Sequence, residues 1–252
     1  MLLKDRIILT TGAGSGIGRA VALAFAREGA FVLLLGRRSK TLTPVYDAIV
    51  AAGGQASIVP LDLETQLQRV PEVVQKIQER FGRLDGLLHA AAALGGLTPL
   101  ALYDPVTWEK VMRINLTAPF FLTQQLLPLL RKSDNASVIQ VISGVGRQGR
   151  AFWGAYAASK AGLLNLTQTW AQELVNTPVR INAVDPGPTA TAMRATAFPG
   201  ENPADLPPPE AIAPVFLYLA SPHSHERGEC LEARQWREWH PPAEISAEIS
   251  AP

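Results

Sequence analysis

Tyr156 and Lys160 are four residues apart, and Ser143 lies thirteen positions upstream of the tyrosine. On a helix this spacing places a phenol and an ammonium on one face, close enough to interact. A phenol ordinarily titrates near pH ~10. A neighbouring cation favours the phenolate, so we expect Lys160 to lower the Tyr156 pKa toward neutrality and to prepare it for proton transfer. The same spacing also arises by chance on helix surfaces. Other motifs of the chain must therefore decide between a proton-transfer pair and two unrelated surface residues.

A glycine-rich turn near the N-terminus indicates a phosphate site. Residues 11–18 read Thr-Gly-Ala-Gly-Ser-Gly-Ile-Gly between an apolar run and a segment of helical period. Glycines let the backbone approach a pyrophosphate, and a helix N-terminus offers free N–H groups and a partial positive charge. The spacing is neither the usual dinucleotide motif, because Ile17 replaces its last small residue, nor a Walker loop. The alternative is a merely tight turn. The residues expected to contact the cofactor here are Gly12, Ser15, Gly16, Ile17 and Gly18.

Two arginines follow the second apolar run, where an enzyme that prefers NAD carries an acidic residue for the ribose hydroxyl. Arg37 and Arg38 can hold a 2′-phosphate in charge-assisted pairs, and Gly36 removes the carboxylate that would repel it. The pattern therefore favours NADP(H) over NAD(H), with a solvated basic corner as the alternative. After the third run, Asp62 and Leu63 are placed to meet an adenine ring, although Asp62 is also a suitable helix N-cap.

Composition limits the class of protein. The chain has 252 residues, 47% of them hydrophobic, and a formal net charge of +1, which gives no sign of a nucleic-acid or anionic-membrane partner. Cys230 is the single cysteine, so no intrachain disulfide can form, as is typical of a reducing compartment. The N-terminus lacks the build of a signal peptide, and charged residues interrupt every long apolar stretch. We expect a cytoplasmic protein that acts on a small molecule.

Short apolar runs alternate with segments of helical period, which predicts an α/β fold: a single doubly wound parallel sheet of about seven strands with helices on both faces. Long apolar helices are predicted for Trp108 to Leu130 and Phe152 to Leu174, while prolines exclude a regular element from Phe198 to Pro209. That segment is expected to be a surface loop beside the site, either a lid or a plain connection. We place one domain at residues 1–235 and a mobile tail at 236–252. The strands are predicted at Arg6–Thr10, Phe31–Leu35, Ala56–Leu61, Gly86–Ala90, Ser137–Ile142, Val179–Val184 and Glu229–Ala233.

The motifs, in their order and intervals, resemble the classical short-chain dehydrogenase/reductases over roughly residues 4 to 220. The resemblance rests on the glycine turn, Asn115, the set Ser143, Tyr156 and Lys160, and the sequence Pro186-Gly187-x-x-x-Thr191. A narrower likeness, to the YciK-type proteobacterial oxidoreductases, rests on residues 144–156 and 191–199.

This resemblance implies a Rossmann fold and a proton-transfer mechanism. Tyr156 would exchange a proton with a substrate oxygen while hydride passes to or from a nicotinamide, and Ser143 would hydrogen-bond that oxygen. Lys160 would hold the nicotinamide ribose and lower the Tyr156 pKa, and Asn115 would bend its helix to hold a relay water. Considered alone, Ser143 could be an ordinary strand-end hydroxyl, and Asn115 a capping or core amide. The resemblance assigns further cofactor contacts to Ala91, Pro186, Gly187 and Thr191.

The loop after the fourth predicted strand departs from the family pattern. It reads His89-Ala90-Ala91-Ala92 where the family usually has Asn-Asn-Ala-Gly, although YciK-type proteins also tend to begin this motif with His. The second Asn and the Gly help this loop to pack under the cofactor's adenosine half. Their loss makes cofactor affinity less predictable than the fold.

Other functions have less support in the sequence. There is no Gly-x-Ser-x-Gly elbow, which a serine hydrolase would use to present its nucleophile. His223 and His225 form a close pair, but no carboxylate or cysteine cluster completes a metal site, so no metal is expected. A catalytically idle NADP-binding sensor or partner subunit would be expected to have lost Ser143, Tyr156 or Lys160, and all three are present. An epimerase or dehydratase of the extended group would be expected to have a larger C-terminal part than this chain has. The resemblance implies a homodimer or homotetramer. Apolar Phe152, Trp153, Met193 and Phe198 favour an apolar or aromatic carbonyl substrate.

Overall fold

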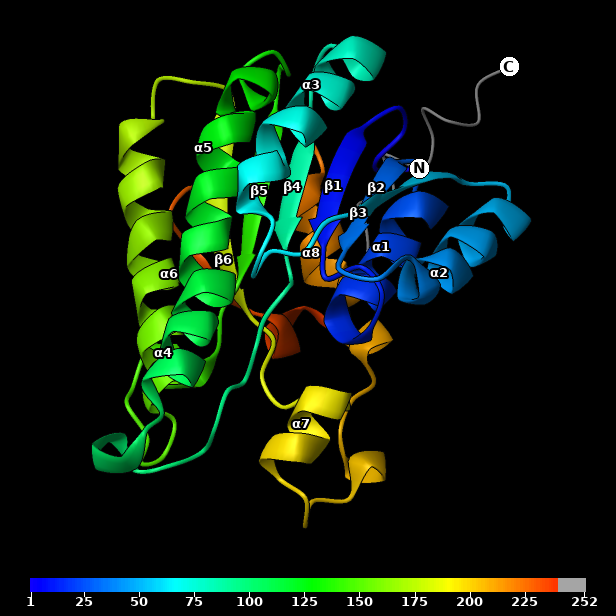
Figure 1. Cartoon of the computed structure of the whole chain (residues 1–252). Helices are drawn as coiled ribbons and strands as arrows, with labels where there is room; N and C mark the ends of the chain where they lie inside the picture. Colours follow the sequence, from blue (N-terminus) through cyan, green and yellow to red (C-terminus); the bar gives the residue numbers. More distant parts are fainter. Residues whose placement is uncertain (240–252) are drawn as a thin grey trace.

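Apolar runs of the chain form seven parallel strands that lie side by side in one sheet in the computed structural model, which describes residues 1–239 (Figure 1). The strand order is β3-β2-β1-β4-β5-β6-β7. Each predicted strand is confirmed to within one residue at either end, because the leucine-rich and β-branched runs are bounded by residues that end a strand. The bounds are β1 Ile7–Thr11, β2 Phe31–Gly36, β3 Gln55–Pro60, β4 Gly86–His89, β5 Ala136–Val141, β6 Val179–Asp185 and β7 Cys230–Glu232.

Helices cover both faces of the sheet, as the alternating pattern predicts. One core lies between the sheet and α1, α2 and α8, and a second lies between the opposite face and α3 and α5 (Figure 1). None of the helices in residues 1–239 is long and apolar enough to cross a membrane. The helices are α1 Gly16–Arg27, α2 Ser39–Ala51, α3 Val70–Phe81, α4 Pro105–Met112, α5 Ala118–Leu130, α6 Gly154–Glu173, α7 Ala192–Ala197 and α8 Ala213–Ala220.

Both long helices differ in detail from the prediction. The first begins earlier, at Pro105, and one π-helical stretch, Arg113–Thr117, separates α4 from α5. The second begins at Gly154 rather than Phe152, because Phe152 has a φ of 74°, which a right-handed helix excludes. A π-helical stretch accommodates one extra residue in a turn and often marks a functional position.

The proline-rich segment 198–209 is mostly irregular, but it contains one short helical turn, Pro203–Asp205, which begins with a proline at a position where helices tolerate it. At the C-terminus, the rings of Trp236 and Trp239 pack against Tyr218, with centroids 4.6 Å and 5.4 Å from it. The domain boundary at residue 235 stays a prediction, and the rest of the predicted tail, residues 240–252, lies outside the described residues.

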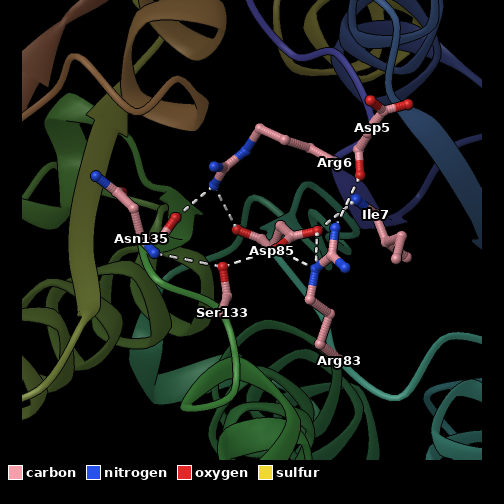
Figure 2. Close-up of polar contacts among 7 residues, drawn as sticks. All are labelled: Asp5, Arg6, Ile7, Arg83, Asp85, Ser133 and Asn135. Atoms are coloured by element: carbon pink, nitrogen blue, oxygen red, sulfur yellow. Dashed lines mark hydrogen bonds and ion pairs between the residues drawn. The ribbon is translucent and has the colours of Figure 1, made fainter.

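Asp85 ties the amino-terminal edge of the sheet together (Figure 2). Its buried carboxylate accepts hydrogen bonds from the Ile7 N–H at 2.9 Å and the Ser133 hydroxyl at 2.7 Å, and it pairs with the Arg83 guanidinium at 3.1 Å. Arg6 donates to the Asp85 backbone carbonyl at 2.9 Å and to that of Asn135 at 2.5 Å. These contacts join the starts of β1, β4 and β5.

Arg180 extends this network to β6 and to the end of α8. Its guanidinium, 3% exposed, donates to the Asn135 side chain at 2.8 Å, to the Ser224 hydroxyl at 2.7 Å and to the carbonyls of Leu219 and Ser221 at 3.1 Å. Burial lowers the pKa of Arg180 to about 10. The charged side chains of Arg6, Asp85 and Arg180 at the amino-terminal edge are therefore held by hydrogen bonds to other groups of the protein.

Candidate active site

A cleft of about 540 Å³ lies along the carboxyl-terminal edge of the sheet, where ligands bind in open α/β folds. It brings together most of the residues that the sequence singles out. Three are not among its lining: Asn115, Ser143 and Gly187. Those that line it are Gly12, Ser15, Gly16, Ile17, Gly18, Arg37, Arg38, Asp62, Leu63, Ala91, Tyr156, Lys160, Pro186 and Thr191.

The glycine turn joins β1 to α1 and has no room for side chains. A Cβ on Gly12, whose φ is 66°, would lie 2.8 Å from the Ala91 backbone, and a Cβ on Gly18 would lie 2.4 Å from the Gly12 carbonyl. Ser15 precedes α1 in an extended conformation, and its side chain does not cap the helix. The first N–H groups of α1 thus remain available to a phosphate at the cleft.

Arg37 and Arg38 follow β2 with exposed side chains and line the same cleft. Within residues 1–239 neither guanidinium takes part in a hydrogen bond or an ion pair, so both are free to bind an anion. Asp62 does not cap a helix, the alternative considered from the sequence. Its carboxylate accepts from the Glu64 N–H at 2.9 Å and shapes the turn beside the cleft.

Tyr156 lies in the first turns of α6 with 8% of its surface exposed. Burial and, to a smaller extent, the charge of Asp185 raise its pKa to about 12, although a hydrogen bond with the nearby Ser143 hydroxyl acts in the opposite direction. The predicted lowering by Lys160 is not found in this structure. The ammonium does lie 5.7 Å from the phenol ring centroid, on the same face as the spacing predicts, but burial outweighs any attraction from this distance.

Lys160 is almost completely buried, at 2% exposed, and its ammonium donates a 2.7 Å hydrogen bond to the Val141 carbonyl at the end of β5. Burial lowers its pKa to about 8. Gly146 allows this close approach, because a Cβ there would lie 2.8 Å from the Lys160 Cβ. The ammonium therefore extends from α6 to the end of β5, and Lys160 lines the cleft together with Tyr156.

Asn115 lies at the centre of the π-helical stretch and is fully buried. Its amide accepts from the Ala93 N–H at 2.7 Å and donates to the Ala93 carbonyl at 2.9 Å and to the Ser159 hydroxyl at 3.0 Å. It is thus a core amide that connects the loop after β4 to α6, one residue from Lys160. Both N–H groups of the side-chain amide are thus used within the protein.

Ser143, Gly187 and Thr191 occupy the ends of strands or helices. Ser143 follows β5 in an extended conformation, near the phenol of Tyr156. Gly187 has a φ of 64° and donates its N–H to the Asp185 carboxylate at 3.1 Å. The Thr191 hydroxyl caps α7 by accepting from the Arg194 N–H at 3.1 Å.

His89 is buried behind the cleft, at the end of β4. Its Nε2 lies 3.0 Å from the Thr123 hydroxyl, while Nδ1 has no partner within residues 1–239. Burial, with a further contribution from the Lys160 charge, lowers the His89 pKa to about 3. The loop that follows is held by Thr11, whose hydroxyl accepts from the N–H groups of Ala90 and Ala91 at 3.1 Å. These bonds fix a loop that lacks the family's Asn and Gly.

Two charged features of the site escaped the sequence analysis. Asp185 ends β6 and raises the Tyr156 pKa, and its position just before Pro186-Gly187 was a signal that a carboxylate stands at this edge. Lys110 and Glu64 both line the cleft and pair at 2.9 Å. Their segments are distant in the chain, so no local pattern reveals that pair.

Comparison with known proteins agrees with this geometry. The family model of the short chain dehydrogenases matches residues 6–202. The chain is 46% identical to the uncharacterized oxidoreductase YciK of Escherichia coli (strain K12) over 228 residues, 90% of each protein. A short chain dehydrogenase structure from Pseudomonas syringae is 48% identical, with a TM-score of 0.90 over 92% of this chain and 96% of that one. One from Shigella flexneri 2a, complexed with NADP, is 46% identical, with a TM-score of 0.90 over 92% of this chain and 98% of that one.

The buried His89 predicts an acid-sensitive contribution to stability. Its pKa is lowered in the folded protein, from 6.5 to about 3, so the unfolded chain binds more protons between these values and stability falls as pH falls below 6.5. For one titrating group, the free energy of unfolding changes by at most about 1.4 kcal/mol per pH unit. Urea unfolding of wild type and His89→Asn from about pH 7.5 to about pH 5 should show a steeper loss for wild type.

The exposed His223 provides the matched control, because His223→Asn should keep the wild-type slope. Parallel curves for wild type and His89→Asn would mean that His89 binds a proton equally well in the folded and unfolded chains, which would contradict a lowered pKa in the folded protein.

Proposed function

The chain belongs to the short-chain dehydrogenase family, and from that premise we propose that it is an NADP(H)-dependent oxidoreductase that interconverts a carbonyl and an alcohol. The observation that carries the proposal is the position of Tyr156 and Lys160 in the same cleft as the glycine turn and the two arginines. A proton-transfer pair next to a dinucleotide-binding site is the arrangement that hydride transfer between a nicotinamide and a carbonyl group requires.

The residues present fit the cofactor. The glycine turn and the N-terminus of α1 would hold the pyrophosphate, and Arg37 and Arg38 would hold the 2′-phosphate that distinguishes NADP from NAD. Asp62 and Leu63 would border the adenine, with Ala91 below it, and Pro186, Gly187 and Thr191 would border the nicotinamide half. The related structure from Shigella flexneri, complexed with NADP, supports this preference. When bound, the nicotinamide supplies or accepts the hydride.

Tyr156 would be the proton donor and acceptor, and Ser143 would hydrogen-bond the substrate oxygen. A phenol whose pKa is raised keeps its proton at neutral pH, so in the state described here it is ready to protonate a carbonyl oxygen. Lys160 would bind the nicotinamide ribose, and its positive charge would offset negative charge that develops on the phenol. Asn115 would act by position, since its amide fixes the loop after β4 against α6.

The substrate would be apolar or aromatic next to its carbonyl group. Met193 lines the cleft, and Trp153 packs edge-on against Tyr156 with a centroid separation of 5.8 Å. The segment after Thr191 completes this side of the site through Phe198, whose ring lies 5.6 Å from Trp153. A cytoplasmic location stays a prediction from the composition.

The protein would assemble as a homodimer or homotetramer through α5 and α6. Phe120 of α5 is 37% exposed and lies 6.3 Å from the ring of Trp170 on α6, which gives this pair of helices an apolar outer face. Apolar faces of this kind mark contact surfaces.

Tyr156→Phe should abolish most turnover while NADPH still binds. Loss of a general acid costs roughly 10²- to 10⁴-fold in rate, whereas the ring and its packing on Trp153 are kept. The measurement is NADPH oxidation with a panel of aldehydes, ketones and quinones, beside NADPH affinity by fluorescence. Tyr46→Phe on α2, outside the cleft, is the matched control and should behave as wild type. Unchanged turnover in Tyr156→Phe would refute the proposed mechanism.

Arg37→Asp should weaken NADPH binding relative to NADH by roughly tenfold or more, because a charge-assisted contact is replaced by repulsion. The ratio of the two dissociation constants is the measurement. Arg27→Asp makes the same charge change at the far end of α1 and should leave the ratio unaltered. If Arg37→Asp leaves it unaltered too, Arg37 does not bind the 2′-phosphate.

Light scattering at micromolar concentration should give a mass of two or four chains. Phe120→Lys should lower that mass, because it places a charge on the apolar face of α5 and α6. Val50→Lys, at another exposed apolar position, on α2, is the control. A wild-type mass of one chain would contradict the assembly.

A further inference from the structure

Two aromatic rings lie next to Tyr156, outside the set of residues that line the cleft. Trp153, which precedes α6, lies 5.8 Å from Tyr156 in an edge-on arrangement, and Phe198, which follows α7, lies 5.6 Å from Trp153. We call Trp153 and Phe198 the aromatic pair. It links the segment before α6 to the segment after α7, so a substrate that reaches Tyr156 from this side meets these two rings.

The position of Phe198 is fixed by its own neighbours. The Arg194 guanidinium lies 3.7 Å from the ring centroid of Phe198 and binds the Glu201 carboxylate through two hydrogen bonds, of 2.6 Å and 2.7 Å. The Phe198 N–H also donates to the Arg194 carbonyl. The charge of Arg194 is therefore neutralised where it lies, and the ring is held in place before any substrate arrives.

Arg150 adds a positive charge beside the aromatic pair. Its guanidinium carbon lies 5.2 Å from the Phe198 ring centroid and 6.0 Å from that of Trp153. The side chain is exposed, and within residues 1–239 it has no acidic partner. Two other arginines near the site differ, because Arg194 binds Glu201 and Arg147 binds Glu232 at 3.1 Å. Arg150 alone of these three keeps a guanidinium available to an anion from solution.

The charges around the phenol of Tyr156 limit where a negative group of the substrate could bind. Asp185 acts on Tyr156 strongly enough to raise its pKa, and it accepts the Gly187 N–H at 3.1 Å. The Arg147 guanidinium lies 4.0 Å from the Asp185 carboxylate and also pairs with Glu232, so these charges offset one another. Arg150 has no acidic partner within residues 1–239, and an anion beside it would be attracted. The charges of the site thus direct a negative group of the substrate toward the aromatic pair.

We propose that the substrate is a carbonyl compound that carries a carboxylate, which Arg150 binds, and an apolar body that packs on Trp153 and Phe198. This inference rests on the proposed function, because it takes Tyr156 and Ser143 as the groups that meet the carbonyl oxygen. A guanidinium suits the role, since its fork of N–H groups matches the two oxygens of a carboxylate. The rings keep the guanidinium in position without neutralising it.

The test is binding, which does not depend on turnover. The protein saturated with NADP is titrated in a calorimeter with para-carboxybenzaldehyde and with its methyl ester, and with para-formylcinnamate and its methyl ester as a longer pair. Wild type should bind each acid more tightly than its ester, and Arg150→Gln should reduce this preference about tenfold. Arg150→Lys, which keeps the charge, should restore part of it.

Arg131→Gln is the matched control, because it removes one exposed arginine at the end of α5, away from the cleft. It should keep the wild-type preference. The proposal is overturned if wild type binds neither acid more tightly than its ester, which includes the case in which no compound binds. It is also overturned if Arg150→Gln keeps the preference for the acids, because Arg150 would then only pack on the rings. Turnover of the same aldehydes is measured separately. A preference that depends on Arg150 without NADPH oxidation would count against the proposed function and not against the carboxylate site.

Discussion

The site depends on burying the Lys160 ammonium where, within residues 1–239, no carboxylate pairs with it. A pKa lowered from 10.5 to about 8 corresponds to roughly 3 kcal/mol against the charged form. The Val141 carbonyl, 2.7 Å away, is the hydrogen-bond acceptor that stabilises it. That bond requires α6 to lie close to the end of β5, which Gly146 permits. Tyr156, one turn earlier on α6, is placed by the same packing.

The two edges of the sheet use charge in opposite ways. At the amino-terminal edge, the Asp85 carboxylate is bound by backbone and side-chain groups of several elements (Figure 2). The Arg180 guanidinium is likewise bound by backbone and side-chain groups, so this edge is held together by the protein's own groups. At the carboxyl-terminal edge, Arg37 and Arg38 remain exposed, and the buried Lys160 and Tyr156 line the same cleft. The same strands therefore have a hydrogen-bonded network at their amino-terminal ends and a ligand-binding cleft at their carboxyl-terminal ends.

The sequence could predict what depends on local pattern. Strand bounds, the glycine turn and the lining of the cleft follow from apolar runs, special backbone conformations and motif spacing. It could not predict what depends on distant packing. The Tyr156 pKa is raised because tertiary packing buries this side chain of α6, and because Asp185 acts on it from the end of β6. Likewise, no local pattern distinguishes Arg150, which has no acidic partner within residues 1–239, from Arg147 and Arg194, which pair with Glu232 and Glu201.

The place of β1 within the sheet has a consequence for how the chain folds. β1 lies between β2 and β4, and β4 begins at Gly86, more than seventy residues further along the chain. During synthesis, one edge of the first strand therefore stays without its partner until most of the first hundred residues have left the ribosome. Such long-range parallel pairing is slow to form and leaves a hydrogen-bonding edge open to other chains in the meantime. The glycine turn that later holds the cofactor follows directly on that exposed strand, so the site takes shape only after β4 has docked.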